Sequence, residues 1–264
     1  MYIKRSILTN NAKALARTNG RFGDIYRIIL PESDSVMCET STTLRIHRIT
    51  YREARDKIES LAKGIVARFG ANDRYIALYG ENSPEWIMLF WAILRSGNRA
   101  YLINTRQPDY FTESVLSTLD AVGIVSLHGA SGLSFCAEAS VAELFELAKE
   151  SVALDDDAPF GNEIAITTSG TTLREKICIY HGENFSKQLL MTPEVTDDNK
   201  TLRATYNGHH RQDPLMLTAV EAYSFVALLF ITCPCHRSPA FPNKILRPQN
   251  GQQGNPLLPM QCLS

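Results

Sequence analysis

A run of small hydroxyl-bearing residues is the part of this sequence that most directly suggests chemistry. Residues 167–176 read Thr-Thr-Ser-Gly-Thr-Thr-Leu-Arg-Glu-Lys, and an apolar, strand-like segment lies on either side. Backbone amides and hydroxyls gathered in a turn between two strands form a concave surface that binds anions. A lysine that follows such a turn adds a mobile positive charge for a phosphate group. The pattern predicts a phosphate-binding loop that consists of Thr168, Ser169, Gly170, Thr171, Thr172 and Lys176.

Two other interpretations fit part of the same segment. A surface loop rich in Ser and Thr, with no ligand, has a similar composition. The Walker phosphate loop requires Gly-Lys followed by Ser or Thr, and residues 167–176 do not contain that order. The upstream sequence is therefore needed to choose between an ordinary surface loop and a phosphate site.

The loop and the sequence before it resemble the adenylate-forming superfamily, which includes acyl-CoA synthetases, luciferases and the adenylation domains of peptide synthetases. The loop of that superfamily usually reads Thr-Ser-Gly-Thr-Thr-Gly-x-Pro-Lys-Gly, and residues 168–172 and Lys176 match it in order. The segments 50–53, 81–86 and 92–97 are also similar to its N-terminal subdomain. The resemblance covers roughly residues 40–195.

The resemblance implies a two-step reaction on a small-molecule carboxylate. The carboxylate attacks the α-phosphate of ATP and gives an acyl-adenylate and pyrophosphate, and a thiol such as coenzyme A then takes the acyl group. The loop would hold the β- and γ-phosphates, and Mg²⁺ would accompany the nucleotide. Positioning and charge neutralisation would carry the phosphorus-centred step. The matched motifs assign no catalytic residue, and they leave the acyl substrate and the acceptor thiol open.

Several positions depart from the pattern of the superfamily. Leu173 replaces the third glycine of the loop, which is costly if the backbone there is left-handed. Glu175 replaces the proline and adds a negative charge, and Ile177 replaces the glycine after the lysine. Further on, Asn184 keeps its place but His181 is out of register. A divergent subfamily and a weakened ATP site both explain these changes, and the intact hydroxyl run favours the divergent subfamily.

The segments that must position the loop alternate between strands and helices from about residue 50 to 190. Thr50 and Glu53 form a capping box that predicts a helix start, apolar residues continue at helical spacing to Phe69, and Gly70 ends the helix. Further strands are expected at 74–79, 100–103, 123–127, 163–167 and 177–180, and further helices at 83–97, 109–119 (capped by Asp109), 140–150 and 183–190. The alternation predicts an α/β fold with the parallel-sheet subdomains of an adenylate-forming N-terminal domain, here incomplete.

Composition and charge exclude several other classes of protein. The formal net charge of −1 argues against nucleic-acid binding, because such proteins usually carry a basic face. The N-terminal apolar run is too short for a secretory signal, and the six scattered cysteines argue against a disulfide framework, so a cytoplasmic location is expected. The stretch from Leu215 to Thr232 has the length of a membrane span, but Glu221 within it is costly in lipid. No membrane span is therefore predicted.

The composition changes after Gly208, where we divide the chain into an N-terminal portion of an AMP-binding domain (1–208) and an atypical tail (209–264). The tail holds seven of the twelve prolines and only two acidic residues. The adenine-binding, ribose-binding, hinge and lysine motifs of the superfamily are not found there, which suggests a frame shift near residues 206–209 and a truncated copy. A genuine disordered or partner-binding tail is the alternative. The spacing in Cys233-Pro234-Cys235-His236 is too tight for a zinc pair, so no metal site is predicted.

The sequence thus leaves two functions of different classes open. The first is an ATP-dependent carboxylate ligase, and the second is a non-catalytic remnant of the same fold that binds a nucleotide or a partner. A membrane-associated protein that uses residues 215–232 is a third, weaker interpretation. The sequence does not indicate the oligomeric state.

Overall fold

The computed structural model describes residues 13–41, 46–81, 83–129, 131–151, 153–168, 176–191 and 261–263. For 39–41, 46, 168, 176, 187–191 and 261–263 it describes the backbone alone. The strands are β1 (Val36–Ser41), β2 (Ile46–Thr50), β3 (Tyr75–Tyr79), β4 (Arg99–Leu102), β5 (Gly123–Ser126), β6 (Ala137–Ser140), β7 (Glu163–Thr168), β8 (Lys176–His181) and β9 (Gln261–Leu263). The helices are α2 (Phe22–Ile29), α3 (Tyr51–Phe69), α4 (Pro84–Arg95), α5 (Asp109–Thr118), α6 (Val141–Glu150) and α7 (Gly182–Met191).

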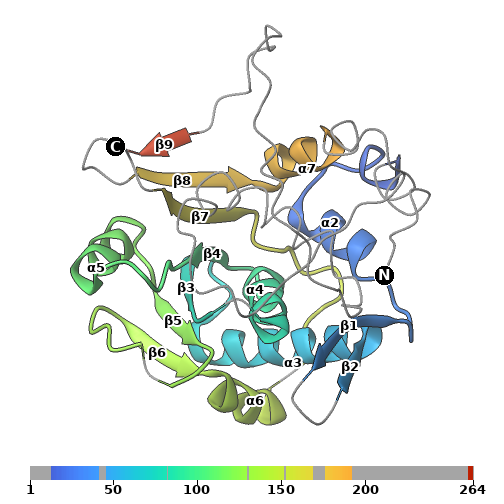
Figure 1. Cartoon of the computed structure of the whole chain (residues 1–264), viewed down its shortest axis with the longest axis horizontal. Helices are drawn as coiled ribbons and strands as arrows, with labels where there is room; N and C mark the ends of the chain where they lie inside the picture. The colour runs from blue at the N-terminus through green and yellow to red at the C-terminus, as the bar shows by residue number, and fades with distance from the viewer. Residues whose placement is uncertain are drawn as a thin grey trace, which may run out of the picture.

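One seven-stranded sheet organises these elements, in the order β6-β5-β3-β4-β7-β8-β9 (Figure 1). The strands from β6 to β7 run parallel, whereas β8 pairs antiparallel with β7 and β9 pairs antiparallel with β8. A separate antiparallel pair, β1 and β2, lies beside the start of α3. The predicted α/β fold is confirmed, but the sheet is mixed because β7 and β8 form a hairpin.

Helices cover both faces of the sheet, and successive residues of β3 alternate between them. Ile76 and Leu78 pack into a core with residues of α2, α3, α4 and α6, whereas Tyr75 and Ala77 pack into a core with residues of α5. This alternation follows from the two-residue period of side chains along a strand. Because all four residues are buried, β3 is the centre of the fold.

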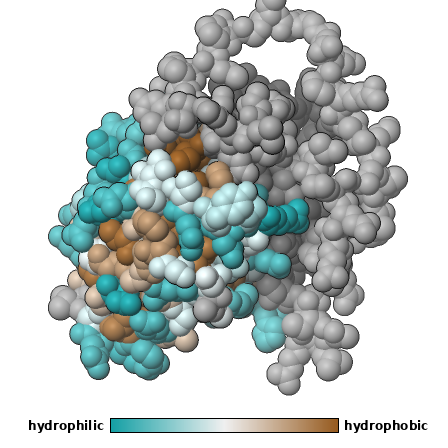
Figure 2. All heavy atoms as spheres, turned by 90° about the vertical axis from the view of Figure 1, so that its left-hand side faces the viewer, coloured by the Kyte–Doolittle hydropathy of each residue, from teal (hydrophilic) through white to brown (hydrophobic). Residues whose placement is uncertain are grey.

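The α5 side shows apolar side chains between polar ones at the surface (Figure 2). Tyr110 in α5 is 77% exposed, and Phe135, in the segment before β6, is 42% exposed. They are the large apolar side chains recorded as exposed within the part of the chain that the structure describes. Helix α5 covers this side of the sheet, because its Val115 and Leu116 are buried in the core there.

Helix α3 begins and ends where the sequence predicts. The Thr50 hydroxyl accepts from the Glu53 amide at 3.2 Å, and the Glu53 carboxylate accepts from the Thr50 amide at 2.8 Å. Both groups of the predicted capping box are therefore paired, and Gly70 follows the helix with φ 81°. Ser83 caps α4 in the same way, through the Trp86 amide at 3.1 Å. The cap predicted for α5 is wrong, because Pro108 takes the N-cap position and Asp109 is already helical.

Gly64 sets the distance between α3 and α6. A Cβ atom at this position would lie 2.1 Å from the Leu144 carbonyl oxygen, which is far inside a normal contact. We expect Gly64→Ala to lower the free energy of unfolding by about 1–3 kcal/mol, because the clash with α6 outweighs the better helix propensity of alanine. Urea unfolding of the variant measures this difference.

Lys57→Ala is the matched control for Gly64→Ala, since Lys57 is exposed on the same helix. We expect it to change the free energy of unfolding by no more than about 0.5 kcal/mol. A Gly64→Ala protein as stable as the wild type would show that α6 can shift without cost.

Five elements were not expected from the sequence: α2, β1, β2, β6 and β9. Strand β9 lies within the predicted tail and pairs with β8 through Gln261, Cys262 and Leu263. The other residues from 192 to 260, and residue 264, lie outside the described part of the chain. The division of the chain at residue 208 therefore stays a prediction.

Candidate functional site

The predicted phosphate-binding loop closes the hairpin of β7 and β8. The two strands pair from Glu163 and His181 at one end to Thr168 and Lys176 at the other. Thr168 is the last residue of β7 and Lys176 the first of β8, so the backbone brings the two ends of the loop opposite each other. Because β7 runs parallel to β4, the loop leaves the sheet at the carboxyl end of the parallel strands. This is the end at which ligands bind in open α/β sheets.

The individual phosphate ligands are a separate prediction. Ser169, Gly170, Thr171 and Thr172 lie outside the described residues, and for Thr168 and Lys176 the structure describes the backbone alone. The assignment of these six residues to phosphate binding therefore stays a prediction. Leu173 and Glu175, the departures from the superfamily pattern, lie in the same undescribed segment.

The loop after β4 also contacts the end of β7. The buried Thr167 hydroxyl donates to Gln107 Oε1 at 3.0 Å. Gln107 belongs to a turn in which the Asn104 side-chain oxygen accepts from the Arg106 amide at 3.1 Å. Sequence analysis missed this contact, because its partners are 60 residues apart in the chain. The polar run after the strand predicted at 100–103 was the available signal.

A hydrogen-bonded network connects the parallel strands at their amino ends, which lie opposite the end that carries the loop. The Glu163 carboxylate accepts from the Tyr75 hydroxyl and from Arg99 Nη1, both at 2.8 Å, and lies 3.5 Å from His181 Nδ1. Arg99 also donates to Asp73 at 2.9 Å through Nε. Burial and the bond to Glu163 raise the pKa of Tyr75, and the bond from Arg99 lowers the pKa of Asp73. This network links the first residues of β3, β4 and β7. It therefore holds β7, the strand that leads into the loop, beside the other two.

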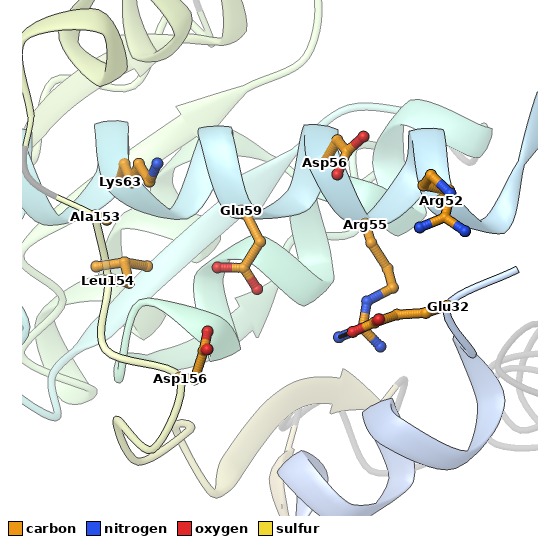
Figure 3. Close-up of a pocket in the computed structure, with 9 residues that line it drawn as sticks. All are labelled: Glu32, Arg52, Arg55, Asp56, Glu59, Lys63, Ala153, Leu154 and Asp156. Carbon is orange, nitrogen blue, oxygen red and sulfur yellow. Dashed lines mark ion pairs between the residues drawn. The ribbon is translucent and has the colours of Figure 1, made fainter.

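A surface groove of about 390 Å³ lies along α3 (Figure 3). Its walls come from α3, from Glu32 after α2 and from residues 153–156. Charges of both signs line it and are partly paired, as in the 3.3 Å contact between Arg55 and Glu32. None of its lining residues belongs to β7 or β8, so this groove is separate from the predicted phosphate site.

Two features are not found among the described residues. In that part of the chain, no group of three or more His, Cys, Asp or Glu side chains is placed to hold a metal ion. No described helix is both long and apolar enough to cross a membrane. The stretches from Leu215 to Thr232 and from Cys233 to His236 lie outside the described residues.

The fold and the hairpin define an α/β protein with a candidate anion site at the carboxyl end of parallel strands. The family model of AMP-binding enzymes matches residues 35–231, which is most of the chain and includes the predicted loop. The chain therefore belongs to the AMP-binding enzyme family. The match continues past residue 208. A search of curated proteins finds no match.

Solved adenylation structures share the fold. The chain is similar to the N-terminal subdomain of Klebsiella oxytoca NpsA in complex with 3-hydroxybenzoyl-AMSN, with a TM-score of 0.59 and 19% identity over 85% of this chain and 55% of that one. The adenylation domain of a carboxylate reductase from Mycobacterium chelonae has a TM-score of 0.55 and 13% identity, over 69% of this chain and 38% of that one. O-succinylbenzoate coenzyme A synthetase (MenE) from Bacillus subtilis, in complex with AMP, has a TM-score of 0.50 and 16% identity, over 58% of this chain and 41% of that one. The chain spans about half, or less, of the length of these structures.

Proposed function

We propose that this chain takes part in the ATP-dependent activation of a small-molecule carboxylate as an acyl-adenylate. The observation that carries the proposal is the position of the hydroxyl-rich loop. It lies within the family match and joins two paired strands at the carboxyl end of a parallel sheet. A loop held at both ends in this place can direct its amides and hydroxyls at one anion.

In this proposal the loop residues bind the nucleotide through its phosphates. The amides and hydroxyls of residues 168–172 donate to the β- and γ-phosphates, and the Lys176 ammonium neutralises part of their charge. This arrangement orients the α-phosphate for attack by the carboxylate and stabilises the leaving pyrophosphate.

The donor set of the loop fits Mg²⁺ that arrives with the nucleotide. The loop offers hydroxyls, amides and one lysine, and Mg²⁺ is commonly held by substrate phosphates with few protein ligands. When bound, the ion supplies charge neutralisation at the phosphates.

For the second step we propose transfer of the acyl group to a thiol, such as that of coenzyme A. A coenzyme A synthetase is among the structures that share the fold, which supports this acceptor. Incubation with ATP, a carboxylate that supports exchange, and coenzyme A would give a thioester if the proposal holds.

The first step is tested by exchange of radiolabelled pyrophosphate into ATP with a panel of carboxylates. We expect exchange that requires both a carboxylate and Mg²⁺, because pyrophosphate returns to ATP only through a reversible acyl-adenylate. Omission of the carboxylate and addition of a chelator are the controls. Exchange that continues without any carboxylate would come from another reaction and would contradict the proposal.

The alternative function is binding of a nucleotide or a partner without chemistry. Leu173 and Glu175 favour it, because a bulky side chain and a negative charge within the loop both weaken phosphate binding. Equilibrium binding of ATP together with no exchange for any carboxylate would identify this alternative.

The predicted frame shift and truncation are tested at the level of the gene. Resequencing of the source DNA across codons 200–215 and past the stop shows whether another frame continues the family pattern. A ribose-binding acid, a hinge and a C-terminal lysine in another frame would support the shift. An unbroken frame without them would contradict it.

A further inference from the structure

The hydrogen bond between Thr167 and Gln107 joins two elements at the edge of the predicted phosphate site. Thr167 comes directly before Thr168, the first residue of the predicted phosphate-binding loop. Its side chain is 6% exposed, and its hydroxyl donates to Gln107 Oε1 at 3.0 Å. A buried hydroxyl that loses its partner retains a desolvation cost, so this contact favours one position of the end of β7.

Gln107 reaches Thr167 because the chain turns back after β4. The last ladder pair of β4 and β7 is Leu102 with Ile166, so the next residues of both strands lie at the same edge. Asn104 then forms the turn, since its side-chain oxygen accepts from the Arg106 amide and its carbonyl accepts from the Gln107 amide at 3.0 Å. This side-chain-assisted turn fixes the backbone from which Gln107 extends.

The contact is made beyond the last ladder pair of β7 with β4. Beyond Ile166, β8 is the one strand that pairs with β7 in the part of the chain that the structure describes, through Thr167 with Ile177 and Thr168 with Lys176. Without the Gln107 contact, the end of the hairpin could tilt relative to β4. The hydrogen bond therefore connects the loop end of the hairpin to the rigid parallel sheet.

We propose that Gln107 is a positioning residue for the phosphate-binding loop, which it orients by holding Thr167 at the end of β7. This inference rests on the proposed function. A misplacement of about 1 Å in a positioning element can cost about 100-fold in rate, so a tether at the base of the loop controls how well the loop meets the nucleotide phosphates. Because the contact lies at the end of β7 that leads into the loop, its loss should affect the binding of ATP more than that of the carboxylate.

The test compares Thr167→Val, which removes the hydroxyl at nearly constant volume, with Gln107→Leu and with the double variant. We expect each single change to raise the KM for ATP in pyrophosphate exchange about tenfold, with the KM for the carboxylate unchanged. The double variant should be no worse than the more impaired single variant, because both single changes remove the same bond. Thr167→Ser keeps the hydroxyl and should restore the wild-type KM.

Thr118→Val is the matched control, because the Thr118 hydroxyl donates to the Ser114 carbonyl at 2.9 Å at the far end of α5. We expect it to leave the KM for ATP unchanged. An unchanged KM in Thr167→Val, or an equal rise in Thr118→Val or in the KM for the carboxylate, would overturn the inference.

Hydrogen exchange separates this inference from the proposed function, since it requires no nucleotide. Thr167→Val and Gln107→Leu should speed the exchange of amides in β7 and β8 but not in β5 and β6. If the wild type gave no pyrophosphate exchange, the proposed function would fail, and hydrogen exchange alone would decide whether Gln107 holds β7. Unchanged exchange in β7 and β8 would overturn the inference in either case.

Discussion

Lys176→Ala is expected to slow ATP–pyrophosphate exchange about 100-fold or more, the typical loss when one charge-stabilising group is removed from a transition state. Lys176 opens β8 directly opposite Thr168, at the base of the predicted loop. Because pyrophosphate leaves as a highly charged group, loss of this cation should affect the transition state more than the bound carboxylate. Steady-state exchange with ATP and carboxylate varied separately measures the effect.

Two further lysine variants make this test specific. Lys149→Ala removes an exposed lysine that pairs with Glu146 at 2.7 Å on α6, far from β8 in the sequence, and should leave exchange unchanged. Lys176→Arg keeps the charge with a different shape, so its activity should lie between those of Lys176→Ala and the wild type. Wild-type exchange in Lys176→Ala would remove Lys176 from the proposed site.

Glu59→Ala is expected to lower the free energy of unfolding by about 3 kcal/mol, the lower part of the range for a broken buried ion pair. The Arg95 side chain is only 3% exposed, and its Nε donates to Glu59 at 2.8 Å. Its Nη2 donates to the Asp155 carbonyl, but Nη1 has no hydrogen-bond partner in the described part of the chain. Removal of Glu59 would leave this buried cation without a counter-charge. Urea unfolding measures the loss.

The lower part of the range applies because Glu59 is 32% exposed, so water can replace some of its interaction. Glu146→Ala is the matched control, since its pair with Lys149 is exposed on both sides and should contribute at most about 1 kcal/mol. The double variant Glu59→Leu with Arg95→Met removes both charges and should recover much of the stability. A loss in Glu59→Ala no larger than in Glu146→Ala would show that Arg95 is not dependent on Glu59.

Signals that act within a few residues allowed sequence analysis to predict several elements. The capping box of Thr50 and Glu53, the stop at Gly70 and the Ser83-Pro84 start all place helix ends correctly, because each satisfies backbone groups of its own helix. The strands β3, β4, β5, β7 and β8 were expected within one or two residues of their observed bounds. The short strand β6 carried too few apolar positions for a clear period. Helix α2 did carry one, with Phe22, Ile25, Tyr26 and Ile29 at helical spacing, and sequence analysis missed it.

The family could also be inferred from local sequence, since the hydroxyl run and the segments before it keep their order along the chain. The sequence pattern further indicated that the loop lies between two strands, which the hairpin of β7 and β8 confirms. The phosphate ligands themselves were named from this pattern alone and stay a prediction.

Only the tertiary structure decided which distant residues meet, because no local signal encodes a pairing across many residues. The sheet order places β3 between β4 and β5, and the antiparallel turn of β8 makes the sheet mixed. The contact of Thr167 with Gln107 spans 60 residues and that of Arg95 with Glu59 spans 36. Such contacts form only after helices and strands pack, since packing desolvates polar groups and makes each one that lacks a partner costly. The sequence by itself thus determined most of the elements and the family, and the packed fold determined which distant residues meet at the end of β7.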